Sequence, residues 1–455
     1  MIQHFTLPLS PEAFTDALHK GLGRAMQHAR TCGLAGLEQI VIDACLHDHA
    51  YDPQLEDQRA DWLMNMIFSA KSQDRIVPEL LSHLADPCDD YRDSKQRSQI
   101  ALGLTHRGIG SARPIVYTLL RKSRTSDVSG DEEIIALDGA EGLIHVANFL
   151  GVQLEQDPEF YAYDIAMRSF DDFHGEAKAR HILDAAAFHS AAIVRYLKHV
   201  DDLAQRHTES AVDDEANSAP ARTIWYRNQS AESTIAEIRR TDSRYSPFLF
   251  TEWGRCVPAQ QLVPVFNAML TEIDTARLCK YLRVFQKAKL PTFESALLQY
   301  SDHFDESVRR LANSALSNYR HADVHSLARS RIAQGRFTEN EIELLYNNFA
   351  FEDAESLERH IALPVNNFAK HSSLFDLITL FQKNTVAECR NLMIFAYDNT
   401  PCSDCRRYAI EILLKTQQAP EWIIQECRDD AAKSIRDLFS PPLEPANGLI
   451  PVKSL

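Results

Sequence analysis

Apolar residues recur at intervals of three and four along most of this chain, with charged residues between them. Residues 400–414, TPCSDCRRYAIEILL, show the pattern clearly. Their apolar stripe consists of Cys402, Cys405, Tyr408, Ala409, Ile412 and Leu413. Residues with these spacings lie on one face of a helix. The pattern predicts an all-α protein built from amphipathic helices.

The composition supports the same fold class. The chain has 15 glycines and 19 prolines in 455 residues, below the usual shares of roughly 7% and 5%. Sheet-rich proteins need many tight turns, and those turns need glycine. A chain that is 45% hydrophobic but poor in glycine therefore favours helices joined by short connections.

One helix pattern is repeated along the chain. The segments VRRLANSAL (308–316) and CRRYAIEIL (405–413) match position for position at an arginine, an alanine and a leucine. Related helices can be aligned on Arg59, Arg97, Arg180, Arg390 and Arg428. The interval from Arg59 to Arg97 is close to the length of a two-helix repeat, roughly 40 residues. Stacked helix pairs would form one continuous core.

The segment DESVRRLANSAL (305–316) resembles the second helix of a HEAT repeat, whose pattern has an Asp at the inter-helix turn and an Arg in the next helix. The resemblance is clear at 305–316 and 400–414 and weaker at 57–67, 93–104 and 174–187. It implies an α-solenoid of stacked helix pairs. Asp305 with Arg309, and Asp404 with Arg406, would then tie one repeat to the next.

Changes in composition divide the chain into four parts. Residues 1–205 and 223–439 are expected to form two HEAT-like halves. Between them, residues 206–222 are acidic and rich in Ser, Ala and Asn, which predicts a flexible linker. Residues 440–455 contain four prolines and cannot continue a helix.

Charge and cysteine content limit the partners and the compartment. A formal net charge of −16 opposes nucleic-acid binding by the bulk surface, and it suits either a basic protein partner or simply solubility, of which solubility is favoured. The apolar stretch 182–197 is interrupted by Asp184, His189 and Arg195, so no membrane span is expected. The nine scattered cysteines and the lack of an export signal indicate a reducing cytoplasm.

The C-x-x-C at Cys402 and Cys405 could be packing, a metal site or a redox pair. Thr400 is a good helix N-cap and Pro401 suits the first helical position, which places both thiols on the buried stripe. A structural zinc site needs four ligands, and the chain has no second C-x-x-C and no H-x-x-x-H nearby. Core packing is therefore favoured, and no metal or other cofactor is predicted.

A second candidate is the histidine-rich segment LHDH (46–49). His47 and Asp48, with Asp43 one turn earlier, could bind a metal. An HD-type phosphohydrolase would need this dipeptide and an upstream histidine, for which His28 is available. The favoured interpretation is a helix end, where histidine suits the C-terminal dipole.

The other catalytic signals are weak. Residues 170–176, FDDFHGE, could be a carboxylate–histidine cluster, but a polar turn closed by Gly175 is favoured. The chain has no G-x-x-x-x-G-K, G-x-S-x-G or H-E-x-x-H, which removes the commonest NTPases, serine hydrolases and zincins. HEAT-fold di-iron hydroxylases carry His-Glu dipeptides, and this chain has none. No catalytic residue is predicted.

Aromatic and arginine residues mark the predicted partner surface. Trp253 and Arg255, preceded by Trp225 and Tyr226, are of the types enriched at binding hot spots. An aromatic core is the alternative. A further group of predicted partner-binding residues is Arg309, Arg310, Arg406 and Arg407. They belong to the second helix of a repeat, and in HEAT solenoids these second helices line the concave face. These arginines could hold an acidic peptide, but pairing with neighbouring carboxylates is favoured.

These observations lead to three functional hypotheses. The first is a non-catalytic scaffold or adaptor that binds another protein on the concave face of a helical solenoid. The second is a HEAT-like protein that binds nucleic acid or processes bases, which would need a continuous basic stripe. The third is a metal-dependent hydrolase that uses the region of His47 and Asp48. The first is favoured.

Overall fold

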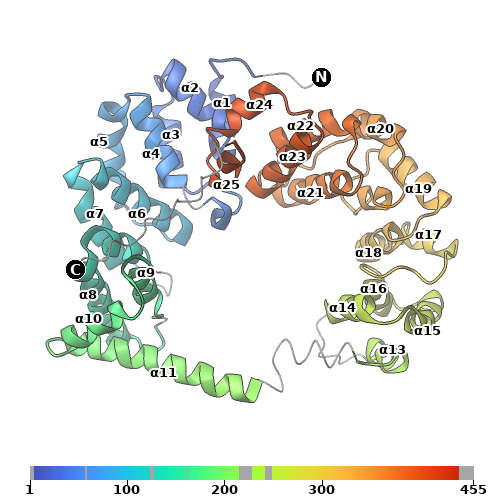
Figure 1. The fold of residues 1–455 in the computed structure, drawn as a ribbon, viewed down its shortest axis with the longest axis horizontal. Helices are drawn as coiled ribbons and strands as arrows, with labels where there is room; N and C mark the ends of the chain where they lie inside the picture. Colours follow the sequence, from blue (N-terminus) through green and yellow to red (C-terminus); the bar gives the residue numbers. More distant parts are fainter. Residues whose placement is uncertain are drawn as a thin grey trace, which may run out of the picture. The chain divides into compact units, whose positions relative to one another are not determined.

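All secondary structure in the described part of the chain is helical (Figure 1). The computed structural model describes residues 5–56, 59–122, 128–160, 162–214, 228–240 and 248–439, with the backbone alone for 207–214 and 387. No strand occurs within these ranges, so the protein is all-α as the hydrophobic periodicity predicts.

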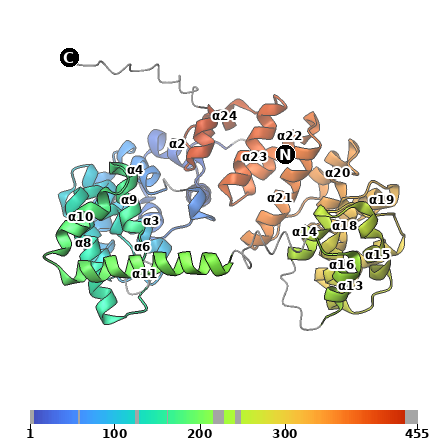
Figure 2. The same ribbon diagram turned by 60° about the horizontal axis from the view of Figure 1, so that its bottom comes forward.

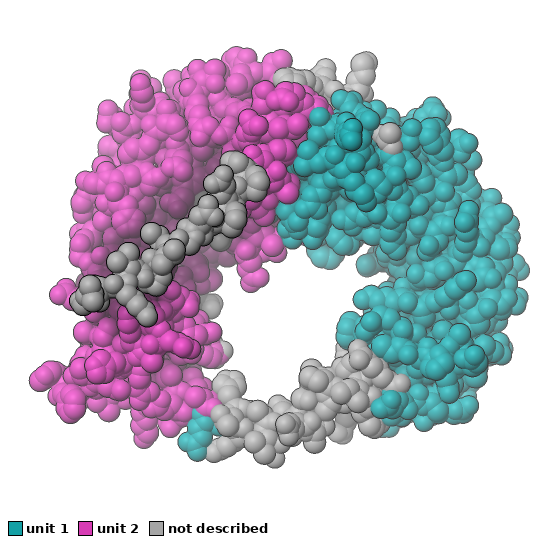
Figure 3. Space-filling view, in the orientation of Figure 1, with its two compact units in different colours: residues 1–2, 205–419 teal, residues 3–204, 420–455 magenta. Residues whose placement is uncertain are grey.

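The chain forms two compact units (Figure 3). Unit 2 comprises residues 3–204 and 420–455, and unit 1 comprises residues 1–2 and 205–419. Residues 420–439 therefore belong to one unit with the N-terminal helices.

The helices of unit 2 are mostly short, and only α8 and α11 are much longer than the others. They are α1 (Pro11–Lys20), α2 (Gly23–Cys32), α3 (Glu38–Leu46), α4 (Arg59–Ser69), α5 (Gln73–His83), α6 (Tyr91–His106), α7 (Arg113–Lys122), α8 (Asp131–Gln156), α9 (Ile165–His174), α10 (Lys178–Ala187), α11 (Ala191–Asp214), α24 (Glu421–Cys427) and α25 (Lys433–Arg436). Short 3-10 turns are η1 (Pro53–Leu55), η2 (Gly110–Ala112) and η5 (Asp437–Phe439).

Every second helix of unit 2 belongs to one row. The row runs α24, α2, α4, α6, α8, and each of these helices contacts the next. Helices α3 and α5 contact each other beside this row, and α9 and α10 pack on α8. The apolar stripes meet between the rows, where Phe14, Leu63, Ile100 and Val146 are fully buried.

The C-terminal segment is an integral part of unit 2. Glu426 accepts hydrogen bonds from the Arg24 backbone N–H at 3.2 Å and from its Nε at 2.6 Å. Trp62 Nε1 donates to the Asp429 carbonyl oxygen at 2.8 Å. The backbone N–H of Ala431 donates to the carbonyl oxygen of Gly21 at 2.8 Å. Both ends of the chain therefore build one core.

Helix α8 is the one helix in the described residues that is long and apolar enough to cross a membrane by length and composition. Gly139 has non-helical backbone angles (φ 56°, ψ −123°) and kinks the helix. Its apolar side chains Ile134, Leu143 and Val146 are completely buried in unit 2. These features are typical of a core helix in a globular unit.

Helix α11 extends beyond the predicted start of the linker. It is a long continuous helix from Ala191 to Asp214 (Figures 1 and 2), whereas the flexible linker was expected to begin at residue 206. Residues 215–222 of the predicted linker lie outside the described residues, and so does the tail 440–455.

Unit 1 is built from short helices, of which α21 is the longest and α17 the shortest. They are α13 (Ala231–Arg239), α14 (Phe248–Cys256), α15 (Ala259–Leu270), α16 (Thr275–Val284), α17 (Ala296–Tyr300), α18 (Glu306–Ser317), α19 (Ala322–Ala333), α20 (Glu352–His360), α21 (Asn367–Lys383), α22 (Arg390–Asn399) and α23 (Ser403–Lys415). Two 3-10 turns, η3 (Ile342–Leu345) and η4 (Ala387–Cys389), complete it.

Unit 1 has the same arrangement of alternate helices. One row runs α14, α16, α18, η3, α21, α23, and each element contacts the next. Helices α19, α20 and α22 form a second row, and α22 packs against α23. Asp305 caps α18 by accepting from the backbone N–H groups of Ser307 and Val308 at 2.8 and 3.2 Å, as an Asp at an inter-helix turn should.

Two of the recurring arginines donate to carbonyl oxygens near the ends of earlier helices. Arg59 donates to the Leu18 carbonyl oxygen at 2.9 Å, and Arg97 to that of Leu46 at 2.9 Å. The last carbonyls of a helix have no partner within it, so these two arginines satisfy them. Arg309 donates to the carbonyl oxygen of His303 at 2.8 Å, whereas Arg180 pairs with Asp184 and Asp201.

Candidate functional site

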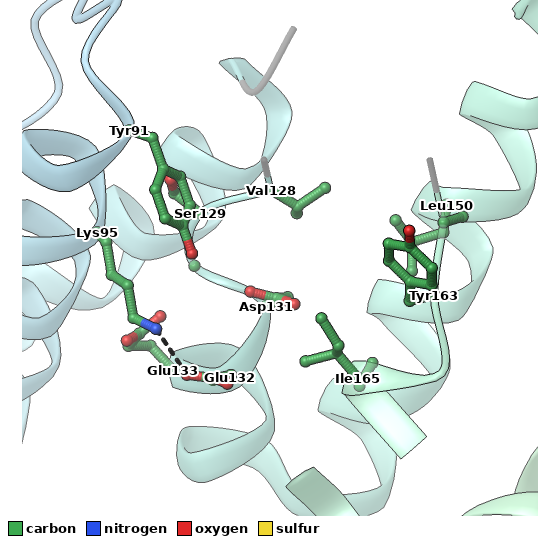
Figure 4. Close-up of a pocket in the computed structure, with 13 residues that line it drawn as sticks. Tyr91, Lys95, Val128, Ser129, Asp131, Glu132, Glu133, Leu150, Tyr163 and Ile165 are labelled. Carbon is green, nitrogen blue, oxygen red and sulfur yellow. Dashed lines mark ion pairs between the residues drawn. The ribbon is translucent and has the colours of Figure 1, made fainter. Parts of the chain in front are cut away.

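A cavity of about 210 Å³ lies in unit 2 beside the beginning of α8 (Figure 4). Helices α6, α8 and α9 and the connections before α8 and α9 contribute its walls. The lining consists of Tyr91, Lys95, Val128, Ser129, Gly130, Asp131, Glu132, Glu133, Leu150, Ala162, Tyr163, Ile165 and Ala166. One wall is strongly acidic and the other is apolar and aromatic.

The acidic wall is the first turn of α8. Asp131, Glu132 and Glu133 are its first three residues, and carboxylates are favoured there by the helix dipole. Gly130 precedes them with φ +95°, a conformation that suits glycine. A Cβ at Gly130 would approach the Val116 carbonyl oxygen to 3.0 Å. The tight packing of this glycine therefore fixes the position of the three carboxylates.

One lysine faces this acidic turn. Lys95 Nζ lies 3.5 Å from Glu132 Oε2 (Figure 4), and Glu132 Oε1 also accepts a hydrogen bond of 3.5 Å from Ser169 Oγ. Burial disfavours the charged form of Lys95, but Glu132, Tyr91 and Glu133 outweigh this effect and raise its pKa. Three carboxylates and one ammonium leave the pocket with a formal negative charge when all are ionised.

Two of the carboxyl groups hold their protons unusually tightly. Burial, reinforced by the charge of Glu132, raises the pKa of Asp131 to about 6. Burial, followed by the charges of Asp131 and Glu132, raises the pKa of Glu133 to about 7. An added cation would relieve this mutual repulsion, because an opposite charge favours ionised carboxylates.

The opposite wall offers apolar contacts. Ile165, 42% exposed, lies there with Leu150 and Tyr163, whereas Tyr91 lies on the other side of the pocket, beside Ser129 and near Lys95 (Figure 4). The backbone carbonyl oxygen of Tyr163 accepts a hydrogen bond of 2.9 Å from Tyr196 Oη, which fixes the position of Tyr163. Carboxylates opposite aromatic and aliphatic groups suit a side chain with an apolar stem and a cationic end, as lysine and arginine have.

The predicted aromatic surface divides between core and solvent. Trp253 is fully buried on α14, and its Nε1 donates to a backbone carbonyl oxygen at 3.0 Å. Arg255 is exposed and pairs with Glu252 at 2.6 Å. Trp225 and Tyr226 lie outside the described residues. Within the described residues of this predicted surface, Arg255 alone is presented to solvent.

The four arginines of the predicted concave face have different environments. Arg309 makes two bonds of 2.6 Å to Glu339, and Arg407 pairs with two carboxylates of its own helix at 2.6 and 3.4 Å. Arg406 is completely buried, although its spacing from the apolar stripe places it on a polar face. Arg310 is exposed and lines a small cavity of about 150 Å³. Of these four arginines, Arg309 and Arg407 pair with neighbouring carboxylates.

A larger cavity of about 670 Å³ in unit 2 is lined by several arginines. Its walls comprise Met26, Arg30, Asp61, Trp62, Asn65, Phe68, Ser69, Arg107, Arg428, Asp429 and Arg436. Arg30 pairs with Asp429, and Arg107 donates to Asn65 Oδ1 at 2.7 Å. Arg436 donates to backbone carbonyl oxygens. Because these guanidinium groups already bind protein groups, the cavity is a weaker candidate for an anionic ligand.

The histidines near the end of α3 surround Asp43. Its two oxygens lie 3.0 Å from His47 Nδ1 and 2.9 Å from His49 Nε2. The rings of His19 and His49 stack with centroids 3.8 Å apart. Burial, followed by the charges of His49 and Arg59, lowers the pKa of His19 to about 4. The structure thus brings Asp43, His49 and His19 together.

The other residues of the hydrolase hypothesis have separate roles. Asp48 accepts a hydrogen bond of 3.2 Å from Arg92 Nε, on α6. His28 is buried, and its Nδ1 accepts from the Leu9 backbone at 3.0 Å. Neither belongs to the Asp43 cluster. In the segment 170–176, the residues up to His174 belong to α9, and Gly175 ends the helix with φ +104°, so the chain turns only from Gly175 onward.

The C-x-x-C pair is buried, as its spacing predicts, but it does not lie within the helix as expected. Helix α23 begins at Ser403, and Cys402 occupies the N-cap, whereas Thr400 was expected there. Thr400 Oγ1 instead accepts from the Cys402 backbone at 3.2 Å. A hydrogen bond from Cys405, helped by one from His371, lowers the pKa of Cys402 to about 4. The same bond and burial raise the pKa of Cys405.

Sequence reasoning did not find the acidic pocket. The missed signal is Gly130 followed by three acidic residues and the apolar pair Ile134 and Ile135, which is typical of a helix start. The opposite wall could not be found in this way, since Leu150 lies near the other end of α8 and Ile165 lies on the next helix. Only tertiary packing brings these walls together.

Comparisons with known proteins give no relative. No protein-family model, no curated protein and no solved structure matches this chain.

Proposed function

We propose that the protein is a non-catalytic interaction scaffold built from HEAT-like helix pairs. It binds a basic protein partner by receiving a lysine or arginine side chain in the acidic pocket beside α8. The observation that carries the proposal is the juxtaposition of Asp131, Glu132 and Glu133 with the apolar wall at Leu150, Tyr163 and Ile165.

The HEAT-like assignment is supported by the local contacts of both units. Alternate helices contact one another in sequence along each row, as stacked pairs do. Asp305 caps its helix and Arg309 reaches Glu339, 30 residues further on. These contacts fit the roles that the HEAT pattern gives to an Asp at the turn and an Arg in the next helix.

The size and charge of the pocket support a basic side chain as its occupant. A cavity of about 210 Å³ is too small for a folded element but accommodates one long side chain. The methylene stem would pack against Leu150 and Ile165, and the cationic end would reach Asp131 and Glu133. The net charge of −16 would accelerate encounter with a basic partner through long-range attraction.

The protein is proposed to work in a reducing cytoplasm. The nine cysteines are scattered along the chain, and five of them are buried. Disulfides are rare in proteins of reducing compartments. The alternatives of nucleic-acid binding and metal-dependent hydrolysis have less support, because Arg309 and Arg407 are paired and Asp48 lies outside the Asp43 cluster.

An affinity comparison tests this proposal. Wild-type protein and the Asp131→Asn variant are used to capture proteins from the native host, and each protein that the variant fails to retain is purified and titrated. Loss of a charge-assisted hydrogen bond worth about 1.5–3 kcal/mol should lower affinity roughly ten- to hundredfold.

The matched control is Glu141→Gln, which removes one charge from an exposed position of the same helix. It should bind as tightly as the wild type. Equal retention of every captured protein by wild type and Asp131→Asn would refute the assignment of the pocket.

A further inference from the structure

Three metal-binding side chains meet in unit 1, far from the acidic pocket in sequence. His371 comes from α21, Cys402 from the N-cap of α23 and Cys405 from its first turn. The His371 ring nitrogen and the two sulfur atoms all lie within 4.8 Å of one another. His371 Nδ1 and Cys405 Sγ are 3.5 Å apart.

The separation of His371 Nδ1 and Cys405 Sγ matches an edge of a tetrahedral zinc site. With bonds of about 2.3 Å to sulfur and about 2.05 Å to nitrogen, two ligand atoms at a tetrahedral angle lie about 3.6 Å apart for S and N, and about 3.8 Å for two S. The observed distance between His371 Nδ1 and Cys405 Sγ is therefore that of two ligands of one ion. Little movement of the side chains is needed to admit it.

The backbone already supports Cys402 and Cys405 as a pair. Helix α21 packs directly against α23, which carries His371 to the start of the second helix. The backbone N–H of Cys405 donates to Cys402, and the hydroxyl of Thr400 bonds to Cys405. Hydrogen bonds of this kind orient metal ligands and stabilise thiolates around an ion.

We propose that His371, Cys402 and Cys405 form a zinc site with three protein ligands. Two thiolates and an imidazole are soft and borderline donors that favour zinc over magnesium or calcium. Three protein ligands leave a fourth coordination position, which takes a water molecule. Both cysteines are buried and His371 is half-buried, so the histidine side of the site is the one nearest to solvent.

The second candidate cluster in the described residues is weaker. His19, Asp43 and His49 also have ligand atoms within 4.8 Å of one another. Asp43 is exposed, however, and its two oxygens already bind the rings of His47 and His49. The cluster of His371, Cys402 and Cys405 differs because both cysteines are buried. Its His371 Nδ1 and Cys405 Sγ also lie at the distance expected of two ligands of one zinc ion.

Metal analysis of the reduced full-length protein tests the proposal. Protein purified without chelator should contain about one equivalent of zinc, and Cys402→Ser and His371→Ala should each lose most of it. Cys389→Ser is the matched control, because Cys389 is a buried thiol of unit 1 outside the cluster, and it should retain the zinc. Circular dichroism establishes that each variant is folded.

Cobalt substitution keeps the test valid if a variant fails to fold. Wild-type protein stripped of metal and loaded with Co²⁺ should show thiolate-to-cobalt charge transfer and the intense visible bands of tetrahedral coordination. Zinc should displace the cobalt and abolish these bands.

Two results would overturn the proposal. One is reduced wild-type protein that takes up neither zinc nor cobalt. The other is a Cys402–Cys405 disulfide, found by mass spectrometry in protein purified without reductant, together with the same lack of metal binding after reduction. That combination would assign the pair to redox chemistry.

Discussion

The buried carboxyl group of Glu133 should destabilise unit 2 at alkaline pH. Its side chain is 5% exposed, and burial raises its pKa from 4.5 to about 7. The folded state therefore holds this proton more tightly than the unfolded state, so the free energy of unfolding falls as the pH rises from 4.5 to 7. Glu133→Gln keeps the shape of the side chain and removes the charge.

The size of the effect follows from the two pKa values. A shift from 4.5 to about 7 corresponds to about 3 kcal/mol at pH 8, where the carboxylate of the wild type is ionised in both states. At pH 5 the Glu133 carboxyl group is largely protonated in the folded protein. The destabilisation of the folded state by this group then falls below about 1 kcal/mol. Glu133→Gln should therefore be the more stable protein, chiefly at pH 8.

Hydrogen exchange of α8 amides in increasing urea measures this free energy within unit 2. The control is Glu132→Gln, which removes a half-exposed charge paired with Lys95 at 3.5 Å and should change stability by no more than about 1 kcal/mol. The reasoning is refuted if Glu133→Gln leaves exchange at pH 8 unchanged, or if any gain is the same at pH 5.

Other consequences of the structure can be tested in the same way. Gly151→Ala should destabilise unit 2 by about 1–3 kcal/mol in urea unfolding, because its Cβ would strike a carbonyl oxygen of α11, whereas Gly110→Ala has open space and should be neutral. Asp305→Ala should lower the free energy of unfolding by about 1 kcal/mol, because it removes the N-cap of α18. Asn is also a good N-cap residue, so Asp305→Asn should keep the wild-type stability. Partner affinity, measured by calorimetry, should fall from pH 8 to pH 5 as Glu133 and Asp131 become protonated; constant affinity would contradict the pocket's role.

The fold class could be predicted because helical periodicity is a local property. The stripe that contains Cys405, Ala409 and Leu413 is buried as its spacing requires. The Asp305 cap and the turn at Gly175 also follow from residues close in sequence. Such features need no knowledge of which helices meet.

Features that depend on helix packing could not be predicted. Arg406 lies off the apolar stripe, yet it is fully buried because α23 packs against both α21 and α22, which covers a wider face than one stripe. His371 lies on a different helix from the thiols, with α22 between them in the sequence, and only the contact of α21 with α23 brings it to them. Residues 420–439 join unit 2 through contacts such as Arg24 with Glu426, 402 residues apart.

The acidic pocket has the same origin. Its charged wall is local, as Asp131, Glu132 and Glu133 are consecutive, but its apolar wall comes from the far end of α8 and from the start of α9. A run of acids at a helix start is ordinarily a solvated end. The packing of α6 and α9 on α8 converts it into a partly enclosed site with two raised pKa values.

Photo-crosslinking from the pocket tests the proposed function most directly. A benzophenone side chain is placed at Ile165, on the rim of the pocket (Figure 4), in full-length protein within the native host. The proposal predicts a crosslink to a protein partner that maps, by mass spectrometry, beside a lysine or arginine and disappears when Asp131→Asn is added. A partner that crosslinks equally well with Asp131→Asn, or whose crosslinked segment has no basic residue, would contradict it.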